Sequence, residues 1–272
     1  MADIIKVSYA GRIATITIDN DQKLNALDFD GYYAIAKALN EIALRDDIYI
    51  TIVTGKGRYF SAGANVNMGA RRQQVAENSD LYRVWLQSFV AGNLNTARAF
   101  YQHPKILIAA LNGPAVGLSA ALVAHADFVY AAPHTFLLMP FSSLGLVAEG
   151  GSSHAMVQRL GIAKANEALI QSKRIPCEDL VRTGFVNKVF QCEKGDSDGF
   201  MQQVLKEIDD SMGDHLNNDS LVGIKALIQK PFQETLEKQN VAEVFAGLNR
   251  FVTGIPLEEF EKLATGKKKH KL

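Results

Sequence analysis

Short apolar strands that alternate with helical stretches limit the fold of this chain more than any other feature of its sequence. Residues 4–10 and 12–19 alternate apolar and polar side chains around Gly11, which predicts a β-hairpin. A helix is predicted over Asp28–Leu44, with Asp28 as its N-cap. Strands and helices that follow one another in this way predict an α/β core. The other predicted strands lie at residues 49–53, 105–111, 127–131 and 135–139.

The second part of the chain has mainly helical patterns. A long helix is predicted over residues 79–103, and amphipathic helical segments follow at residues 200–212, 220–229 and 232–251. Neither an internal repeat nor a low-complexity linker interrupts the sequence. We therefore expect one core over residues 1–199 and a C-terminal helical region over residues 200–272.

The composition argues against several classes of function. With 272 residues, 47% of them hydrophobic, the chain can bury a sizeable core. Lys+Arg and Asp+Glu number 29 each, and a net charge of zero gives no overall attraction to nucleic acids or acidic membranes. Cys177 and Cys192 lie outside any C-x-x-C spacing, which argues against a disulfide framework and a zinc site. Polar residues interrupt the most apolar stretch, residues 106–132, so we expect a soluble intracellular protein with no metal ion, no nucleic-acid partner and no membrane span.

Two loops rich in small residues each follow a predicted strand and lead toward a helix. The first is Phe-Ser-Ala-Gly-Ala-Asn at residues 60–65, and the second is Asn-Gly-Pro-Ala-Val-Gly-Leu at residues 112–118. Small residues let a ligand approach the main chain closely, and amides at the start of a helix lack partners. Two such loops on neighbouring strands can direct two N–H groups at one oxygen atom, which is the geometry of an oxyanion hole.

The order of three motifs resembles the crotonase (enoyl-CoA hydratase/isomerase) superfamily. The motifs are Ser-Ala-Gly-Ala-Asn at 61–65, Asn-Gly-Pro-Ala-Val-Gly-Leu-Ser at 112–119 and Pro-Phe-Ser-Ser-Leu-Gly-Leu-Val-Ala-Glu-Gly-Gly at 140–151. Within the superfamily, the chain most resembles the peroxisomal Δ3,Δ2-enoyl-CoA isomerases of fungi, over essentially its whole length. The resemblance implies a spiral core of β-β-α turns, a C-terminal helical trimerisation region, a homotrimer or homohexamer, and an acyl-CoA thioester as substrate.

The resemblance also implies roles for particular residues. The amides of Ala64 and Leu118 would form the oxyanion hole, Glu149 stands at the position of the isomerase base, and Asn93 matches an active-site asparagine. The residues expected to line the thioester and the CoA are Ala62, Gly63, Ala64, Asn65 and Val66 in the first loop, and Asn25, Ala26 and Leu27 before the first long helix.

Elementary chemistry agrees with the isomerase interpretation. Moving a double bond from the 3 to the 2 position requires a base that removes a proton from C2, and two amides that stabilise the enolate oxygen. Apolar neighbours of Glu149 are expected to raise its pKa into a useful range. Such a reaction needs no cofactor. The two positions where hydratases of the superfamily carry acids hold Ala121 and Phe141, which argues against a hydratase.

Alternatives remain at this point. A dienoyl-CoA isomerase of the same fold would want an extra acidic partner, for which the sequence offers no clear position. A catalytically silent subunit that only assembles with relatives is a second alternative. Glu149 alone could be an acid that complements a helix N-terminus, and Ser119 alone could be a hydrolase nucleophile, although packing is its expected role. His103 and His125 are expected to be core residues.

The chain ends in a basic tail. Its last three residues, His270, Lys271 and Leu272, resemble the peroxisomal targeting signal of the Ser-Lys-Leu type, with His270 where serine is commonest. This resemblance predicts recognition by the peroxisomal import receptor and a location in the peroxisomal matrix. The alternative interpretation is a frayed, solvated tail.

Overall fold

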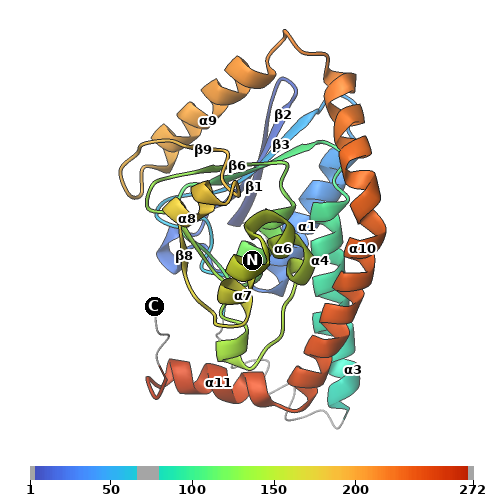
Figure 1. Ribbon diagram of the computed structural model, residues 1–272, viewed down its shortest axis with the longest axis vertical. Coiled ribbons are helices and arrows are strands. Elements are labelled where there is room, and N and C mark those ends of the chain that lie inside the picture. The colour runs from blue at the N-terminus through green and yellow to red at the C-terminus, as the bar shows by residue number, and fades with distance from the viewer. Residues whose placement is uncertain (1–3, 66–79, 269–272) are drawn as a thin grey trace.

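A computed structural model describes residues 4–65 and 80–268 (Figure 1). Its main sheet has six strands in the order β1-β2-β3-β4-β6-β9. The first two strands pair antiparallel, as the predicted hairpin requires, and the remaining pairs are parallel. The strand bounds are β1 Ile5–Ala10, β2 Ile13–Ile18, β3 Ile50–Gly55, β4 Ile106–Leu111, β6 Phe128–Ala131 and β9 Lys188–Val189.

A second, smaller sheet stands beside the first. It contains β5 (Ala115–Val116), β7 (Phe136–Leu138) and β8 (Ile175–Pro176) in that order. The predicted strand at 135–139 therefore exists, but it pairs in this sheet. Strand β5 lies within the second small-residue loop, and β7 pairs parallel with it. The small sheet therefore links that loop to the chain that follows β7.

Helices cover both faces of the main sheet. On one face, α1 (Phe29–Ala43) packs against the strands and against α4 (Ala91–Tyr101). Asp28 caps α1 as predicted, because its Oδ1 accepts a hydrogen bond from Gly31 N at 2.9 Å. On the other face, α9 (Ser197–Met212) packs on the buried isoleucines of β3 and β4. The remaining short elements are η2 Asp21–Lys23, α5 Leu118–Leu122, η4 Val123–His125, η5 Ser142–Leu144, α6 Ser152–Leu160, α7 Ile162–Leu169 and α8 Cys177–Arg182.

The long helix predicted over residues 79–103 is divided into three parts. An α-helix, α3 (Leu81–Trp85), passes into a π-helical turn, η3 (Leu86–Val90), before α4 begins. The predicted helical stretch is therefore present over residues 81–101, with a π-turn inside it that the sequence did not indicate. Main-chain hydrogen bonds in a π-turn span one residue more than in an α-helix, and such a turn needs no glycine or proline to mark it.

The C-terminal region also differs from the prediction. The two amphipathic segments expected at 220–229 and 232–251 form one helix, α10 (Asn218–Val252), with Pro231 inside it. Proline removes one main-chain hydrogen bond, yet the helix continues on both sides. Helix α10 runs alongside α3 and α4, and α11 (Ile255–Ala264) then turns back across one end of the molecule (Figure 1). Within the described residues, no helix is long and apolar enough to cross a membrane. The boundary between core and helical region near residue 200 remains a prediction.

Candidate active site

The two small-residue loops lie against each other. Ser61 and Ala115 form an isolated parallel bridge, and Val116 N donates to Ser61 O at 2.9 Å. A Cβ atom added to Gly63 would lie only 2.7 Å from Val116 O and 3.6 Å from the Cα of Gly117. Since any side chain at residue 63 would collide with the second loop, glycine is what permits this close approach.

Among the described residues, each loop presents one main-chain amide that has no hydrogen-bond partner. Leu118 is the first residue of α5, where helical geometry supplies no acceptor for N–H. Around Ala64, Leu27 N donates to Gly63 O and Asn65 N donates to Leu27 O, but none of the main-chain bonds among residues 4–65 and 80–268 uses the N–H of Ala64. These amides follow Gly63 and Gly117, which are in contact, so both can be directed at one oxygen atom.

A chain of buried hydroxyl groups joins the two loops from behind. Ser61 Oγ donates to Asn25 O at 2.9 Å and Ser119 Oγ donates to Ser61 Oγ at 2.9 Å. The Tyr32 hydroxyl, 3.0 Å from Ser119 Oγ, must then be the donor, since the serine's only proton is already used. Ser61 Oγ also accepts from Gly63 N at 3.1 Å. This series of hydrogen-bonded hydroxyls therefore fixes Gly63 and Ser119, which stand next to the amides of Ala64 and Leu118.

The sequence predicts packing as the role of Ser119 and carries no signal for Tyr32. Ser119 lies 58 residues from Ser61 and 87 from Tyr32, and no short motif joins residues at such separations. Its hydroxyl contacts two other hydroxyls and no histidine, so the structure gives no support to a hydrolase nucleophile at this position.

Glu149 lies beside the second loop. Gly117 N donates to Leu138 O at 2.8 Å, so the strand that leads to Glu149 is anchored next to Leu118. Gly150, the residue after Glu149, packs against the side chain of Leu118, since a Cβ added to Gly150 would lie 2.9 Å from Leu118 Cδ1. The Glu149 side chain is 7% exposed. The turn that carries the predicted base thus contacts Leu118, whose amide is one of the two predicted oxyanion donors.

Burial raises the pKa of Glu149 from 4.5 to about 8, as the apolar neighbours in the sequence predicted. Asn93 Nδ2 donates to Glu149 Oε2 at 3.1 Å and opposes part of this rise by stabilising the carboxylate. A carboxyl with a pKa near the working pH can both accept and return a proton.

Asn93 reaches Glu149 from the first turn of α4, directly after the π-turn η3. The π-turn therefore sets the rotation of this face of α4 relative to α3. Asn93 is 6% exposed, and its Oδ1 has no hydrogen-bond partner among the described residues. An unpartnered buried acceptor next to a titratable acid is a feature of a site that handles protons or ligands.

The C-terminal helices cover the loop that carries Glu149. Arg250 Nε donates to Gly145 O at 2.7 Å, and Ile255 of α11 lies so close to Gly145 that a Cβ there would be 2.6 Å from Ile255 Cγ2. Leu146 packs against both the main core and an apolar cluster between α3, η3 and α10. The buried members of that cluster are Trp85, Phe89, Val90, Val244, Leu248 and Phe251.

Comparison with known proteins identifies the family. Residues 9–250 match the family described as Enoyl-CoA hydratase/isomerase. The chain belongs to this family. A protein of Pyricularia oryzae named Delta(3,5)-Delta(2,4)-dienoyl-CoA isomerase is 57% identical over 282 residues, with 100% of each chain covered. The 3,2-trans-enoyl-CoA isomerase of Saccharomyces cerevisiae is 34% identical, over 98% of this chain and 97% of that one.

The fold agrees with this membership. The crystal structure of an enoyl-CoA hydratase/isomerase from Pseudoalteromonas atlantica T6c matches with a TM-score of 0.81 at 23% identity, covering 99% of this chain and 100% of that chain. The prediction of an α/β crotonase fold with a C-terminal helical region is confirmed. The finer prediction, closest resemblance to Δ3,Δ2 isomerases, is not, because the protein named as a dienoyl-CoA isomerase is more similar.

The positions that argued against a hydratase of this family are buried and apolar in the structure. Ala121 is 0% exposed and Phe141 is 3% exposed, and both belong to the main core. Neither can hold or activate water. His103 and His125 are buried as predicted, and burial lowers the pKa of His103 to about 3.

The residues predicted to contact CoA divide into two groups. The side chain of Asn25 is fully buried and holds main chain: its Nδ2 donates to Lys56 O and Tyr59 O, and its Oδ1 accepts from Asn20 N. Its main-chain N–H donates to Asn20 O and its main-chain oxygen accepts from Ser61 Oγ, so Asn25 supports the loops from inside and presents no free polar group to a ligand. Ala64 and Asn65 are exposed, Ala26 and Ala62 are half-buried, Gly63 and Leu27 are buried, and Val66 lies outside the described residues.

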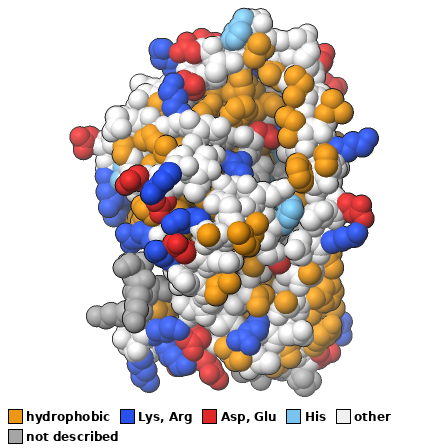
Figure 2. All heavy atoms as spheres, viewed as in Figure 1, with side chains coloured by type: hydrophobic (Ala, Val, Ile, Leu, Met, Phe, Trp, Pro, Cys, Tyr) orange, Lys and Arg blue, Asp and Glu red, His pale blue; other side chains and the backbone are white. Residues whose placement is uncertain are grey.

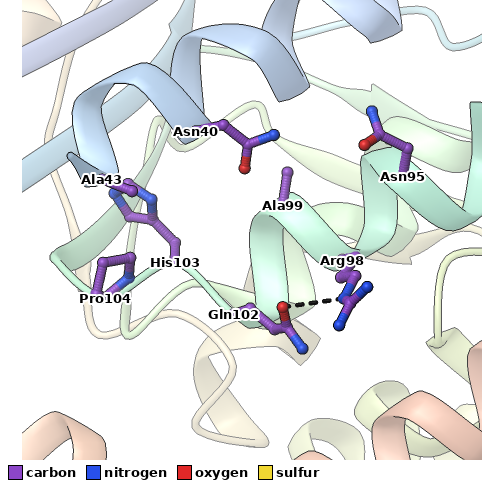
Figure 3. A pocket seen from close by; sticks show the side chains of 8 residues that line it. All are labelled: Asn40, Ala43, Asn95, Arg98, Ala99, Gln102, His103 and Pro104. Atoms are coloured by element: carbon purple, nitrogen blue, oxygen red, sulfur yellow. Dashed lines mark hydrogen bonds between the residues drawn. The ribbon is translucent and has the colours of Figure 1, made fainter.

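Two surface cavities lie away from these residues. A polar pocket of about 320 Å³ between α1 and α4 is lined by Asn40, Asn95, Arg98 and Gln102 among others, and Arg98 Nε donates to Gln102 Oε1 one turn along α4 (Figure 3). A larger apolar groove, about 480 Å³, lies between α9 and α10. Apolar side chains gather in this part of the surface (Figure 2). Neither cavity is lined by Glu149 or by the two free amides.

Proposed function

We propose that this protein is an isomerase that converts 3,5-dienoyl-CoA to 2,4-dienoyl-CoA thioesters. One observation carries the proposal: 57% identity along the whole chain to a protein named as a dienoyl-CoA isomerase. The proposal is supported by one buried carboxyl with a raised pKa, that of Glu149, and by two loop amides, those of Ala64 and Leu118, that engage no main-chain acceptor among the described residues. The absence of acids at residues 121 and 141 argues against water addition.

In the proposed mechanism, ionised Glu149 removes a proton from C2 of the bound thioester. The electron pair of the C2–H bond forms a C1–C2 double bond, and the negative charge on the thioester oxygen is stabilised by the amides of Ala64 and Leu118. When the electron pair moves back from the oxygen, the double bonds shift to C2–C3 and C4–C5. C6 takes a proton, which protonated Glu149 is the group best placed to return, and Glu149 is ionised again. The reaction neither gains nor loses atoms, and it requires no metal or redox cofactor.

A second candidate is Δ3,Δ2-enoyl-CoA isomerisation, and the number of carboxylates favours it. There the proton returns to C4, two carbons from C2, which a single carboxylate can serve from one side. For Glu149 to return the proton to C6, the diene would have to bend around the carboxyl. The nearby acid Glu243 has both oxygens engaged by main-chain N–H groups, so it offers no free second proton donor.

A substrate comparison in D₂O tests both candidates. The purified protein is given a 3,5-dienoyl-CoA and a trans-3-enoyl-CoA of equal chain length, and the product is analysed for deuterium. The proposal predicts a kcat/KM at least ~10-fold higher for the diene, with deuterium entering at C6. A preference for the monoene with deuterium at C4 would reject the proposal in favour of the second candidate. Turnover of neither substrate would reject both and favour a silent assembly subunit.

Replacing Leu118 by proline is expected to remove one oxyanion donor while keeping the helix. Proline lacks the N–H and is well accepted at the first position of a helix, where Leu118 stands. The loss of one such donor costs about 3–4 kcal/mol of barrier, so kcat should fall ~10²- to 10³-fold. Leu118→Ala keeps the amide and controls for the lost side chain. Equal activity of the two variants would exclude this amide from the oxyanion hole.

The tail residues His270, Lys271 and Leu272 lie outside the described residues. We propose that they are read by the peroxisomal import receptor and that the protein acts in the peroxisomal matrix. Deleting Leu272 from a fusion with a fluorescent protein at its N-terminus is expected to change punctate fluorescence to diffuse cytosolic fluorescence. Unchanged puncta would contradict the role of the tail.

Homo-oligomerisation, as a trimer or hexamer, is also a proposal. It is supported by exposed apolar side chains on α10 next to the apolar groove, namely Ile224, Leu227 and Ile228, which are 57%, 72% and 63% exposed. Exposed apolar groups on one face of a helix are typical of a protein interface. Light scattering that gives the mass of a monomer would contradict this proposal.

A further inference from the structure

A second buried carboxylate lies behind the turn that carries Glu149. Glu243 reaches from α10 to the start of α6 and is 6% exposed. Gly151 N donates to its Oε2 at 2.6 Å, and Ser153 N donates to its Oε1 at 2.8 Å. The carboxylate also faces the N-terminal end of α6, where a negative charge is favoured by the helix dipole. Both oxygens thus bind main chain within four residues of Glu149.

The same turn is held from its other side by His125. Its Nε2 lies 2.7 Å from Gly150 O, and since a carbonyl oxygen can only accept, Nε2 carries the proton. Burial lowers the pKa of His125 to about 4, so the ring stays neutral near pH 7. His125 therefore acts as a fixed donor and adds no charge to the site.

The backbone between these contacts has little rigidity of its own. Gly150 and Gly151 both have positive φ angles, 72° and 75°, a conformation that glycine adopts easily and leaves easily. Two adjacent glycines carry no side chains that could anchor the turn by packing. The direction of the Glu149 side chain consequently depends on contacts made from outside: η4 and α10 hold the turn, and Asn93 of α4 binds the carboxyl itself.

We propose that Glu243 is a positioning residue for Glu149, which by binding the amides of Gly151 and Ser153 fixes the catalytic carboxyl relative to the two oxyanion amides. This inference rests on the proposed function of Glu149 as the base. Glu243 touches no substrate in this proposal, and it acts through the backbone and through its charge.

The charge of Glu243 affects the titration of Glu149. Burial is the main cause of the raised pKa of Glu149, hydrogen bonding from Asn93 lowers the pKa, and repulsion by Glu243 raises it further. Tyr32 faces the same carboxyl from α1, but burial raises the pKa of its phenol, so it remains neutral. Burial raises the pKa of Glu243 as well, and hydrogen bonds from Ser153 and from the amide of Gly151 oppose this rise. Among Asn93, Tyr32, His125 and Glu243, the last is the residue whose charge acts on the titration of Glu149.

The alternative is that Glu243 only stabilises the first turn of α6. Such a residue would contribute to the melting temperature and leave kinetics at a fixed temperature unchanged. The two roles are separated by kcat and by the pH at which kcat/KM reaches half its maximum, since neither depends on the stability of a protein that remains folded.

Three variants of the full chain test the proposal with the substrate that the wild type turns over best. Glu243→Gln keeps the length and removes the charge, and Glu243→Asp keeps the charge and cannot span both amides. Glu237→Gln removes a half-buried carboxylate on the same helix that pairs with Arg98 and does not contact the turn of Glu149. We expect kcat to fall ~10- to 100-fold in both variants at residue 243, because a small misplacement of a reacting group has effects of this size. The half-maximum of kcat/KM should move to lower pH in Glu243→Gln alone. Glu237→Gln should match the wild type.

A Glu243→Gln variant with unchanged kcat and unchanged pH dependence would overturn the proposal, even if its melting temperature falls. Should that variant fail to fold, Glu243→Asp decides, and an unchanged kcat there has the same meaning. Glu149→Gln is measured in parallel. Wild-type activity in that variant would remove the proposed function itself, whereas an inactive Glu149→Gln with a fully active Glu243→Gln would remove only the role of Glu243.

Discussion

Glu149→Gln is expected to lower kcat by roughly 10⁴-fold while the protein stays folded and still binds CoA thioesters. General acid–base catalysis contributes up to about this factor, and here one carboxyl takes the proton and is the group best placed to return one. Glutamine has the same shape, and its carbonyl oxygen can accept the hydrogen bond that Asn93 Nδ2 now donates to Glu149. The loss should therefore appear in kcat, with a thioester dissociation constant near that of the wild type.

The matched control is Glu178→Gln, since Glu178 is an exposed carboxylate on α8 whose side chain is 88% exposed. Calorimetric titration with a saturated acyl-CoA of the same length measures binding without turnover. Activity within about tenfold of the wild type in Glu149→Gln would show that another group removes the C2 proton. A large loss of thioester affinity would instead make Glu149 a binding residue.

Local patterns were sufficient to predict the parts of the fold and site that depend on local structure. Alternating side chains predicted the hairpin of β1 and β2, and Asp28 marked the start of α1. The small residues around Gly63 and Gly117 predicted two loops that approach closely, because only glycine leaves room for the neighbouring backbone. Glu149 could be found because it stands inside a contiguous motif.

Residues that act across long separations could not be predicted in this way. Glu243 lies 92 residues from Gly151, and its surroundings in α10 look like any amphipathic helix. The hydroxyl chain from Tyr32 to Ser61 and the histidine that binds Gly150 O are visible only once the helices are packed. The π-turn before Asn93 likewise has no residue type that marks it. Tertiary packing determines these features, and a single sequence does not display it.

The Glu149→Gln variant should also be more stable than the wild type at high pH, by on the order of 5 kcal/mol. The pKa of this carboxyl rises from 4.5 to about 8 on burial. The folded state therefore binds a proton more tightly than the unfolded state, and the stability that this proton contributes is complete below about pH 4.5. It is lost progressively as the pH rises to about 8, where the wild type must hold a buried charge. An uncharged amide at residue 149 does not ionise, so the variant does not lose stability in this pH range through this residue.

Denaturant unfolding of both proteins from pH 5 to pH 9 measures this difference, because groups common to both cancel. The difference in the free energy of unfolding should grow in favour of the variant across this range and level off above pH 8. A constant difference would mean that Glu149 ionises as easily in the folded protein as in water, and a base of that kind would be a weak acid–base partner for a carbon acid at neutral pH. A difference in the free energy of unfolding that grows with pH would show that burial of the Glu149 carboxyl destabilises the folded protein. The same burial raises the pKa on which the proposed catalysis depends.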